Sequence, residues 1–282
     1  MTKKLLLLST GGTIASVVSD EGLAPGESGE ELIKMLGRLE YDITVRDILE
    51  LDSSNIQPEE WKIIAEAIYD HRNEYDGIVV SHGTDTMAYT ASMLTFMLQH
   101  INIPVVLTGS QVPMNVILSD APDNLRLAFA AAANCEPGVY IAFNRKVMRG
   151  CRSVKVRTTA FDAFESVNVP PVGEVTSDGF SIRDHRHPQP GKSQLNTKID
   201  THVSLVKLFP GFDPALLHAM AKNGCHGIVI EAYGLGGMTS IRRNMVAAVG
   251  ELIRNGIPII TSSQCLYERS DLTKYEVGRL AL

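Results

Sequence analysis

Short apolar runs followed by small polar residues alternate with helix-period segments in the first part of the chain, a pattern typical of a parallel α/β sheet. The runs lack in/out alternation, as expected of strands covered by helices on both faces. We therefore predict an α/β fold whose larger N-terminal domain has a mostly parallel sheet. Its strands are expected at residues 4–9, 76–81, 104–108 and 138–143, and its helices at 58–72, 87–99 and 121–134.

The apolar density falls over residues 177–201, where prolines and a glycine interrupt the pattern. We predict an N-terminal domain over residues 1–180 that carries the catalytic motifs, a connector over 181–201 and a smaller C-terminal α/β domain over 202–282. The strands of that second domain are expected at 203–208, 227–231 and 257–261, and its helices at 214–223 and 242–255.

Residues 273–282 start like one more helix, with apolar side chains on one face. The sequence reaches its last residue without a glycine cap or a polar tail. We therefore expect the C-terminal domain to be truncated.

Charge and composition exclude several classes of protein. The chain has 26 Lys and Arg against 32 Asp and Glu, a net charge of −6, which argues against binding to nucleic acid. It has no apolar run long enough for a transmembrane helix, and the leucines near the N-terminus form too short a stretch for a signal peptide. We expect a cytoplasmic protein without membrane contact.

Neither the cysteines nor the histidines indicate a cofactor. The four cysteines lie far apart, with no Cys-x-x-Cys pair, so reduced and scattered thiols are expected. His185 and His187 are the one close pair of histidines, and they lie in a polar stretch flanked by cations. We predict no metal and no cofactor.

Two predicted strands end in turns rich in glycine and hydroxyl groups. The first turn reads Ser9-Thr10-Gly11-Gly12-Thr13-Ile14-Ala15-Ser16, and the second reads Ser81-His82-Gly83-Thr84-Asp85-Thr86. Ligands of open α/β sheets bind at the carboxyl ends of the strands, and glycines let the backbone come close to them. Either turn alone could be a tight strand–helix connection. The P-loop, the serine-hydrolase elbow and, in the first turn, the dinucleotide fingerprint are absent.

Taken together, the motifs make the chain similar to the bacterial-type L-asparaginases, specifically their cytoplasmic type I branch. The resemblance runs from Lys4 to the last residues. The motifs that carry it are Thr10-Gly11-Gly12-Thr13, Asp52-Ser53-Ser54-Asn55, His82-Gly83-Thr84-Asp85-Thr86-Met87, Thr108-Gly109-Ser110-Gln111 and Arg152-Ser153-Val154-Lys155.

The resemblance implies hydrolysis of L-asparagine to L-aspartate and ammonia through a threonine-linked acyl-enzyme, and L-glutamine could be a weaker substrate. It assigns Thr13 as the nucleophile. It assigns Thr84, Asp85 and Lys155 as the other catalytic residues. A lysine that is shielded from water beside hydroxyl groups can accept a proton, and Asp85 would orient it.

Substrate binding is expected to involve Asp52, Ser53, Ser54, Thr84 and Asp85. The Asp85 carboxylate suits the α-ammonium group of asparagine, and Ser53 with nearby backbone N–H groups suits its α-carboxylate. The Asp-Ser-Ser stretch also reads as a turn that leads into the next helix. Many members of the family carry a tyrosine on the loop after the first threonine motif, whereas residues 16–29 contain none.

Two other functions fit the same motifs. One is the amidase subunit of a tRNA-dependent amidotransferase, which normally carries an additional N-terminal domain. The other is a catalytically silent protein that binds or senses an amino acid. For the hydrolase we expect a homodimer or a homotetramer with L-asparagine as its small-molecule partner.

Overall fold

The computed structural model describes residues 2–19, 22–184 and 191–274. The chain divides into two units, Met1–Thr197 and Lys198–Leu282, which we call unit 1 and unit 2. None of the helices within the described residues is long and apolar enough to cross a membrane. The predicted C-terminal helix begins at the end of this range, and its residues from 275 onward lie outside it, as do His185 and His187.

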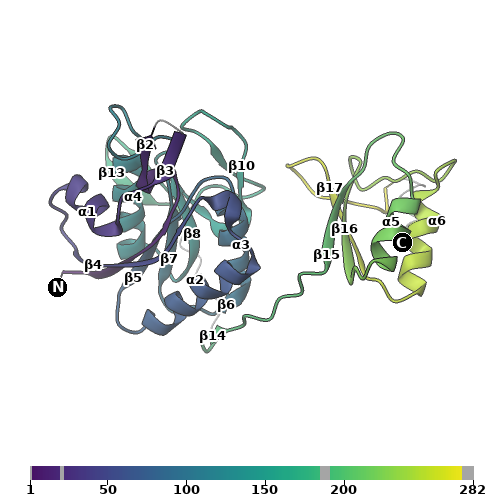
Figure 1. Cartoon of the computed structure of the whole chain (residues 1–282), viewed down its shortest axis with the longest axis horizontal. Helices are drawn as coiled ribbons and strands as arrows, with labels where there is room; N and C mark the ends of the chain where they lie inside the picture. The colour runs from purple at the N-terminus through teal and green to yellow at the C-terminus, as the bar shows by residue number, and fades with distance from the viewer. Residues whose placement is uncertain (1, 20–21, 185–190, 275–282) are drawn as a thin grey trace. The chain divides into compact units, whose positions relative to one another are not determined.

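Unit 1 is built on a sheet in which eight strands are described, in the order β13-β12-β9-β8-β7-β5-β1-β4 (Figure 1). Strands β4, β1, β5, β7 and β8 run parallel, and β9, β12 and β13 continue the sheet in antiparallel pairs. The mostly parallel α/β sheet is thus confirmed. The bounds of these strands are β1 (Lys4–Gly11), β4 (Asp42–Leu51), β5 (Gly77–Ser81), β7 (Pro104–Thr108), β8 (Gly138–Phe143), β9 (Lys146–Arg149), β12 (Gly173–Thr176) and β13 (Gly179–Ile182).

Helices and short strands complete unit 1. Its α-helices are α1 (Gly29–Leu36), α2 (Pro58–His71), α3 (Met87–Met97) and α4 (Ala121–Asn134). Short 3-10 helices are η1 (Thr13–Ala15), η2 (Ser53–Asn55) and η3 (Gly150–Arg152). Three small antiparallel pairs are β2 (Ser16–Ser19) with β3 (Gly22–Pro25), β10 (Ser153–Lys155) with β11 (Phe164–Ser166), and β6 (Leu98–Gln99) with β14 (Gln194–Leu195).

The central strands are buried on both faces, as the missing alternation predicts. Leu5 and Leu7 belong to a core that includes Leu125 and Phe129 of α4. Leu6, between them in β1, points to the opposite face because successive side chains alternate along a strand, and it is also fully buried. Figure 1 shows α1 and α4 on one side of this sheet and α2 and α3 on the other.

Local sequence signals account for where the helices start. Helix α1 begins with a capping box between Ser28 and Glu31. Helix α2 has Pro58 in its first turn, and Ile64 and Ile68, one turn apart on its apolar face, are fully buried.

Unit 2 has a three-stranded parallel sheet in the order β15-β16-β17. Its core forms between this sheet and two helices, around residues such as Leu217, Ile230 and Leu252. The elements are β15 (Val203–Lys207), α5 (Ala215–Lys222), β16 (Gly227–Ala232), α6 (Met245–Arg254) and β17 (Ile259–Ser263).

The main sheet extends into the segment of low apolar density. Strand β13 pairs with β12, and β14 pairs with β6, and both strands lie in unit 1. The low apolar content of these strands reflects their place at the edge of sheets, where side chains remain partly exposed. The domain limits at residues 180 and 202 remain predictions.

Candidate active site

Four turns meet beyond the carboxyl ends of the parallel strands in unit 1. The Gly12 N–H donates a hydrogen bond to the Leu51 carbonyl, with a donor–acceptor distance of 3.0 Å, which joins the turn after β1 to the end of β4. The His82 N–H donates to the Thr108 carbonyl at 2.8 Å, which joins the turn after β5 to the end of β7. This is the edge of an open α/β sheet at which ligands bind.

The two threonine-bearing turns approach one another backbone to backbone. A Cβ atom placed on Gly12 would lie 2.3 Å from the Gly83 nitrogen and 2.5 Å from its Cα. Gly12 also has a φ of 83° and a ψ of 176°, a region that glycine alone adopts readily. Glycine is therefore required here on two counts, and Thr13 begins the short helix η1 directly after this contact.

The turn after β5 also lies against the segment that follows β4. A Cβ atom on Gly83 would lie 2.5 Å from the Ser53 Oγ, and the Thr86 hydroxyl donates to the Ser53 carbonyl at 2.7 Å. The motifs at residues 10–13, 52–55 and 82–87 are thus neighbours in space, although Gly12 and Gly83 lie 71 positions apart in the sequence.

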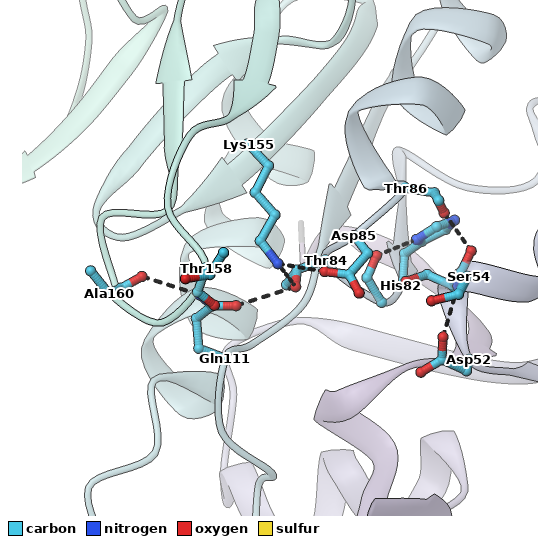
Figure 2. Close-up of polar contacts among 12 residues, drawn as sticks. Asp52, Ser54, His82, Thr84, Asp85, Thr86, Gln111, Lys155, Thr158 and Ala160 are labelled. Carbon is cyan, nitrogen blue, oxygen red and sulfur yellow. Dashed lines mark hydrogen bonds and ion pairs between the residues drawn. The ribbon is translucent and has the colours of Figure 1, made fainter.

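Lys155 connects the two polar side chains of the second turn. Its ammonium group donates to the Thr84 hydroxyl at 2.8 Å and to an Asp85 carboxylate oxygen at 2.6 Å. Figure 2 shows the lysine side chain reaching from β10 toward both residues. The Lys155 side chain is 17% exposed and that of Asp85 is 62% exposed, so the ion pair has one shielded end and one end open to solvent.

Gln111 holds the Thr84 hydroxyl from another side. The Thr84 hydroxyl donates to the Gln111 side-chain carbonyl at 3.2 Å. The amide nitrogen of Gln111 donates to the carbonyls of Thr158 and Ala160, which lie in the loop after the strand of Lys155 (Figure 2). One side chain thus links the Thr84 turn to the segment that follows Lys155.

Asp52, Ser53 and Ser54 form the short helix η2 and its cap. An Asp52 carboxylate oxygen accepts a hydrogen bond from the Ser54 N–H at 2.7 Å, which is the geometry of a helix N-cap. Ser53 is buried beneath Gly83, whereas Asp52 and Ser54 are exposed. The stretch is therefore a turn that leads into a helix, here the short helix η2, as the sequence indicates.

His82 anchors the second turn from inside the protein. It is fully buried, and burial lowers its pKa to about 4, an effect that its hydrogen bond to Gly83 opposes only in part. A carbonyl can only accept, so the His82 Nδ1–H donates to the Gly83 oxygen at 2.7 Å. The Nε2 atom then accepts from the Thr90 hydroxyl at 2.9 Å, and that hydroxyl accepts from Trp61 Nε1–H at 3.0 Å. The neutral imidazole is thus fully hydrogen-bonded.

The side chains of this site do not form a metal-binding group. Across residues 2–19, 22–184 and 191–274, one cluster of three metal-ligating side chains occurs, and it lies in unit 2. In unit 1 the ammonium group of Lys155 already contacts Asp85. The polar groups of this region therefore suit nucleophilic and proton-transfer chemistry on a small polar ligand.

The structure brings Thr84, Asp85 and Lys155 into direct contact, and it brings the turn of Thr13 and the Asp52–Ser54 stretch against the turn that contains Thr84. Among the described residues, the Thr13 hydroxyl has no hydrogen-bond partner. Sequence reasoning missed the contacts of Gln111 and His82, although both residues stand in the quoted motifs. The signal available was their position in the turns after β7 and β5, three residues after Thr108 for Gln111 and next to Ser81 for His82.

Comparisons with known proteins agree with these motifs. The family model for the N-terminal part of asparaginases matches residues 4–188, and the model for the glutaminase/asparaginase C-terminal domain matches residues 202–282. The chain is 43% identical to an L-asparaginase from Thermococcus kodakarensis over 282 residues, which cover 99% of this chain and 85% of that protein.

Solved structures give the same result. The thermostable L-asparaginase from Thermococcus kodakarensis matches with a TM-score of 0.93 over 99% of this chain and 85% of that chain. L-asparaginase I from Vibrio cholerae matches with a TM-score of 0.84 and 30% identity over 94% of this chain and 82% of that chain.

A second group of relatives is longer. One subunit of the glutamyl-tRNA(Gln) amidotransferase from Methanopyrus kandleri is 36% identical over 296 residues, which cover 97% of this chain but 64% of that relative. Since two family models match most of the sequence and an L-asparaginase is 43% identical over 99% of it, the chain belongs to the asparaginase family.

Proposed function

We propose that this protein hydrolyses the side-chain amide of L-asparagine to give L-aspartate and ammonia. The observation that carries the proposal is the Thr84–Lys155–Asp85 contact, set beside the turn that bears Thr13. The similarity to the Thermococcus kodakarensis L-asparaginase supports the same reaction and the same substrate.

Thr13 is the nucleophile of this proposal. Its hydroxyl oxygen attacks the amide carbon, the C–N bond breaks, and ammonia leaves with the proton that the hydroxyl gave up. Water then attacks the resulting ester, which releases L-aspartate and restores the hydroxyl. The structural support for this role is the position of Thr13, which is half-buried at the start of η1, directly after the contact between Gly12 and Gly83.

Thr84, Lys155 and Asp85 move the protons. In the observed arrangement Lys155 donates to both neighbours, and the Thr84 proton points to Gln111. When Lys155 has released a proton to solvent, it takes one from Thr84, and the Asp85 carboxylate stabilises the charge that returns to the lysine. Thr84 then accepts the proton that the Thr13 hydroxyl loses and passes it to the amide nitrogen as ammonia leaves, and Lys155 returns its proton to Thr84.

The substrate is a zwitterion, so its two ends need partners of opposite charge. Lys155 occupies one oxygen of Asp85, and the carboxylate is largely exposed, so its second oxygen can accept from the α-ammonium group. The stretch Asp52–Ser54 supplies hydroxyl and backbone N–H groups for the α-carboxylate. Backbone N–H groups near Thr13 and Thr84 would stabilise the oxyanion, a contribution worth about 3 kcal/mol per donor in other enzymes.

The experiment is ammonia release from L-asparagine by the purified chain, alone and with no tRNA. Three variants accompany it, Thr13→Ala, Lys155→Met and, as a control on an exposed lysine of α1, Lys34→Met. We expect turnover by the native chain and by the Lys34 variant. The rate should fall by a factor of about 10² to 10⁴ on loss of Lys155.

The outcomes separate this proposal from its alternatives. Binding of L-asparagine without turnover by the native chain would favour the sensing protein. The amidase alternative rests on the 36% identity to a subunit of the Methanopyrus kandleri amidotransferase, which is lower than the 43% identity to the L-asparaginase. It predicts ammonia release only when the tRNA-bound substrate complex is present. We further expect a homodimer or homotetramer, which sedimentation of the purified chain tests.

A further inference from the structure

Three side chains of unit 2 converge at the start of its sheet. Asp200 and His202 precede β15, and His226 precedes β16. One Asp200 carboxylate oxygen lies 2.8 Å from the His226 Nδ1, and the other lies 3.5 Å from the His202 Nδ1. The three candidate ligand atoms all lie within 4.8 Å of one another. Both imidazole rings thus face the same carboxylate.

The backbone fixes this arrangement. The His226 N–H donates to the His202 carbonyl at 2.7 Å, which continues the parallel pairing that begins with Val203 and Gly227. The His202 N–H donates to the Asp200 carboxylate at 2.9 Å, and the two imidazole rings lie 4.8 Å apart between centroids. The sheet therefore positions all three residues, although 24 residues separate the two histidines.

The geometry points to a binding site for a divalent transition-metal ion, with Zn²⁺ as the representative, formed by Asp200, His202 and His226. Two imidazoles and one carboxylate are a donor set that zinc uses with water in its remaining position. Metal–ligand bonds of about 2.0–2.2 Å in a tetrahedral site place neighbouring ligand atoms roughly 3.3–3.5 Å apart. The observed nitrogen–oxygen separations are 3.5 Å from His202 to one Asp200 oxygen and 2.8 Å from His226 to the other, and the second is a hydrogen bond that a bound ion would replace.

The nitrogen ligands also define which ions fit. Mg²⁺ and Ca²⁺ prefer sites made of oxygen atoms, whereas imidazole suits zinc, nickel and copper. All three residues are exposed, so an ion reaches them from solvent without any opening of the fold. The sequence-based expectation of no metal considered the pair at residues 185 and 187, and His226 stands too far along the chain to be recognised beside His202.

A bound ion would tie the segment that enters unit 2 to the sheet of that unit. Asp200 lies on the chain before β15, and the two histidines lie at the amino-terminal edge of β15 and β16. The carboxyl ends of those strands, where α/β sheets bind their substrates, lie at the opposite edge. The ion therefore has a stabilising role in this proposal, because a ligand that binds only the folded state raises the free energy of unfolding, and the increase grows with the logarithm of the free ligand concentration.

The test is calorimetric titration of the full-length, untagged protein with Zn²⁺ after treatment with a chelator. Co²⁺ serves as a spectroscopic probe of imidazole ligation. The variants are His202→Asn and His226→Asn, and the control is His218→Asn, a partly exposed histidine of α5 outside the cluster. All three positions are partly or fully exposed, and circular dichroism checks that each variant folds.

We expect one saturable Zn²⁺ equivalent per chain and a rise of the melting temperature with Zn²⁺. Each cluster variant should weaken binding by about a hundredfold or more, since even an outer-shell partner is worth 10–100-fold. The His218 variant should bind like the native chain. A chain that takes up no saturable Zn²⁺, or whose binding survives both cluster substitutions, would overturn the assignment.

Discussion

The contact between Gly12 and Gly83 can be tested by adding a single methyl group. In the Gly12→Ala variant the new Cβ would lie 2.3 Å from the Gly83 nitrogen, against 3.4 Å for the start of ordinary van der Waals contact. Both groups at this point are backbone, so no flexible side chain can move aside. The turns that bear Thr13 and Thr84 must therefore separate by about 1 Å.

The Gly12→Ala substitution should lower both the stability of the protein and its kcat, and the loss of stability has two parts. Alanine at a φ of 83° and a ψ of 176° carries a backbone cost of about 1–3 kcal/mol. Steric overlap adds a further cost of about 1–3 kcal/mol. A displacement of about 1 Å between catalytic groups lowers kcat by about a hundredfold.

Gly37 provides a matched control. Its φ of 74° and ψ of −156° place it in the same backbone region, yet a Cβ there would meet nothing within 4 Å. Gly37→Ala should thus lose about 1–3 kcal/mol of stability with kcat unchanged. The assay is urea unfolding together with ammonia release from L-asparagine for both variants. Equal kcat values in Gly12→Ala and Gly37→Ala would refute the convergence of the two turns on one substrate.

Three further predictions follow from the site. Burial holds the pKa of His82 in the folded chain at about 4, below its ordinary value of 6.5. Between pH 6.5 and pH 4 the unfolded chain therefore binds more protons than the folded chain. The free energy of unfolding falls as the pH drops through this range, by about 3 kcal/mol at pH 4. Urea unfolding at pH 7 and pH 4 should show this loss in the native chain but not in His82→Asn, and parallel losses would contradict the buried neutral imidazole. Asp85→Ala should raise KM and lower kcat together, because the residue contacts Lys155 and would bind the α-ammonium group; an unchanged KM in steady-state kinetics would count against that anchor. Gln111→Leu should lower kcat roughly fivefold with KM retained, since one hydrogen bond of about 1 kcal/mol no longer orients Thr84. A variant that loses only stability would show a purely structural role.

Much of the fold could be predicted because its signal is local. Helix α4 and strands β7 and β8 have the bounds that the apolar pattern predicts, since fully buried strands and amphipathic helices each leave a continuous signature. Strand β4 was missed. It lies at the edge of the sheet, has no fully buried residue and carries charged side chains such as Arg46 and Asp47, so it lacks the apolar run of a central strand.

The site was predictable in its residues but not in its contacts. The turns after β1 and β5 stand out because glycine and hydroxyl residues follow apolar strands. Their approach at Gly12 and Gly83 depends on strand order, since β1 and β5 are neighbours in the sheet, and one sequence does not give that order. The contacts of Gln111 likewise depend on a loop 47 residues further along the chain.

The proposed reaction passes through an ester at Thr13, and the most direct measurement looks for that ester. The native chain is quenched in acid during turnover of saturating L-asparagine, digested and mapped by mass spectrometry. We predict the added mass of one aspartyl group on the peptide that contains Thr13, and no such mass in Thr13→Ala. An aspartyl group on the peptide that contains Thr84 instead would contradict the assignment of the nucleophile.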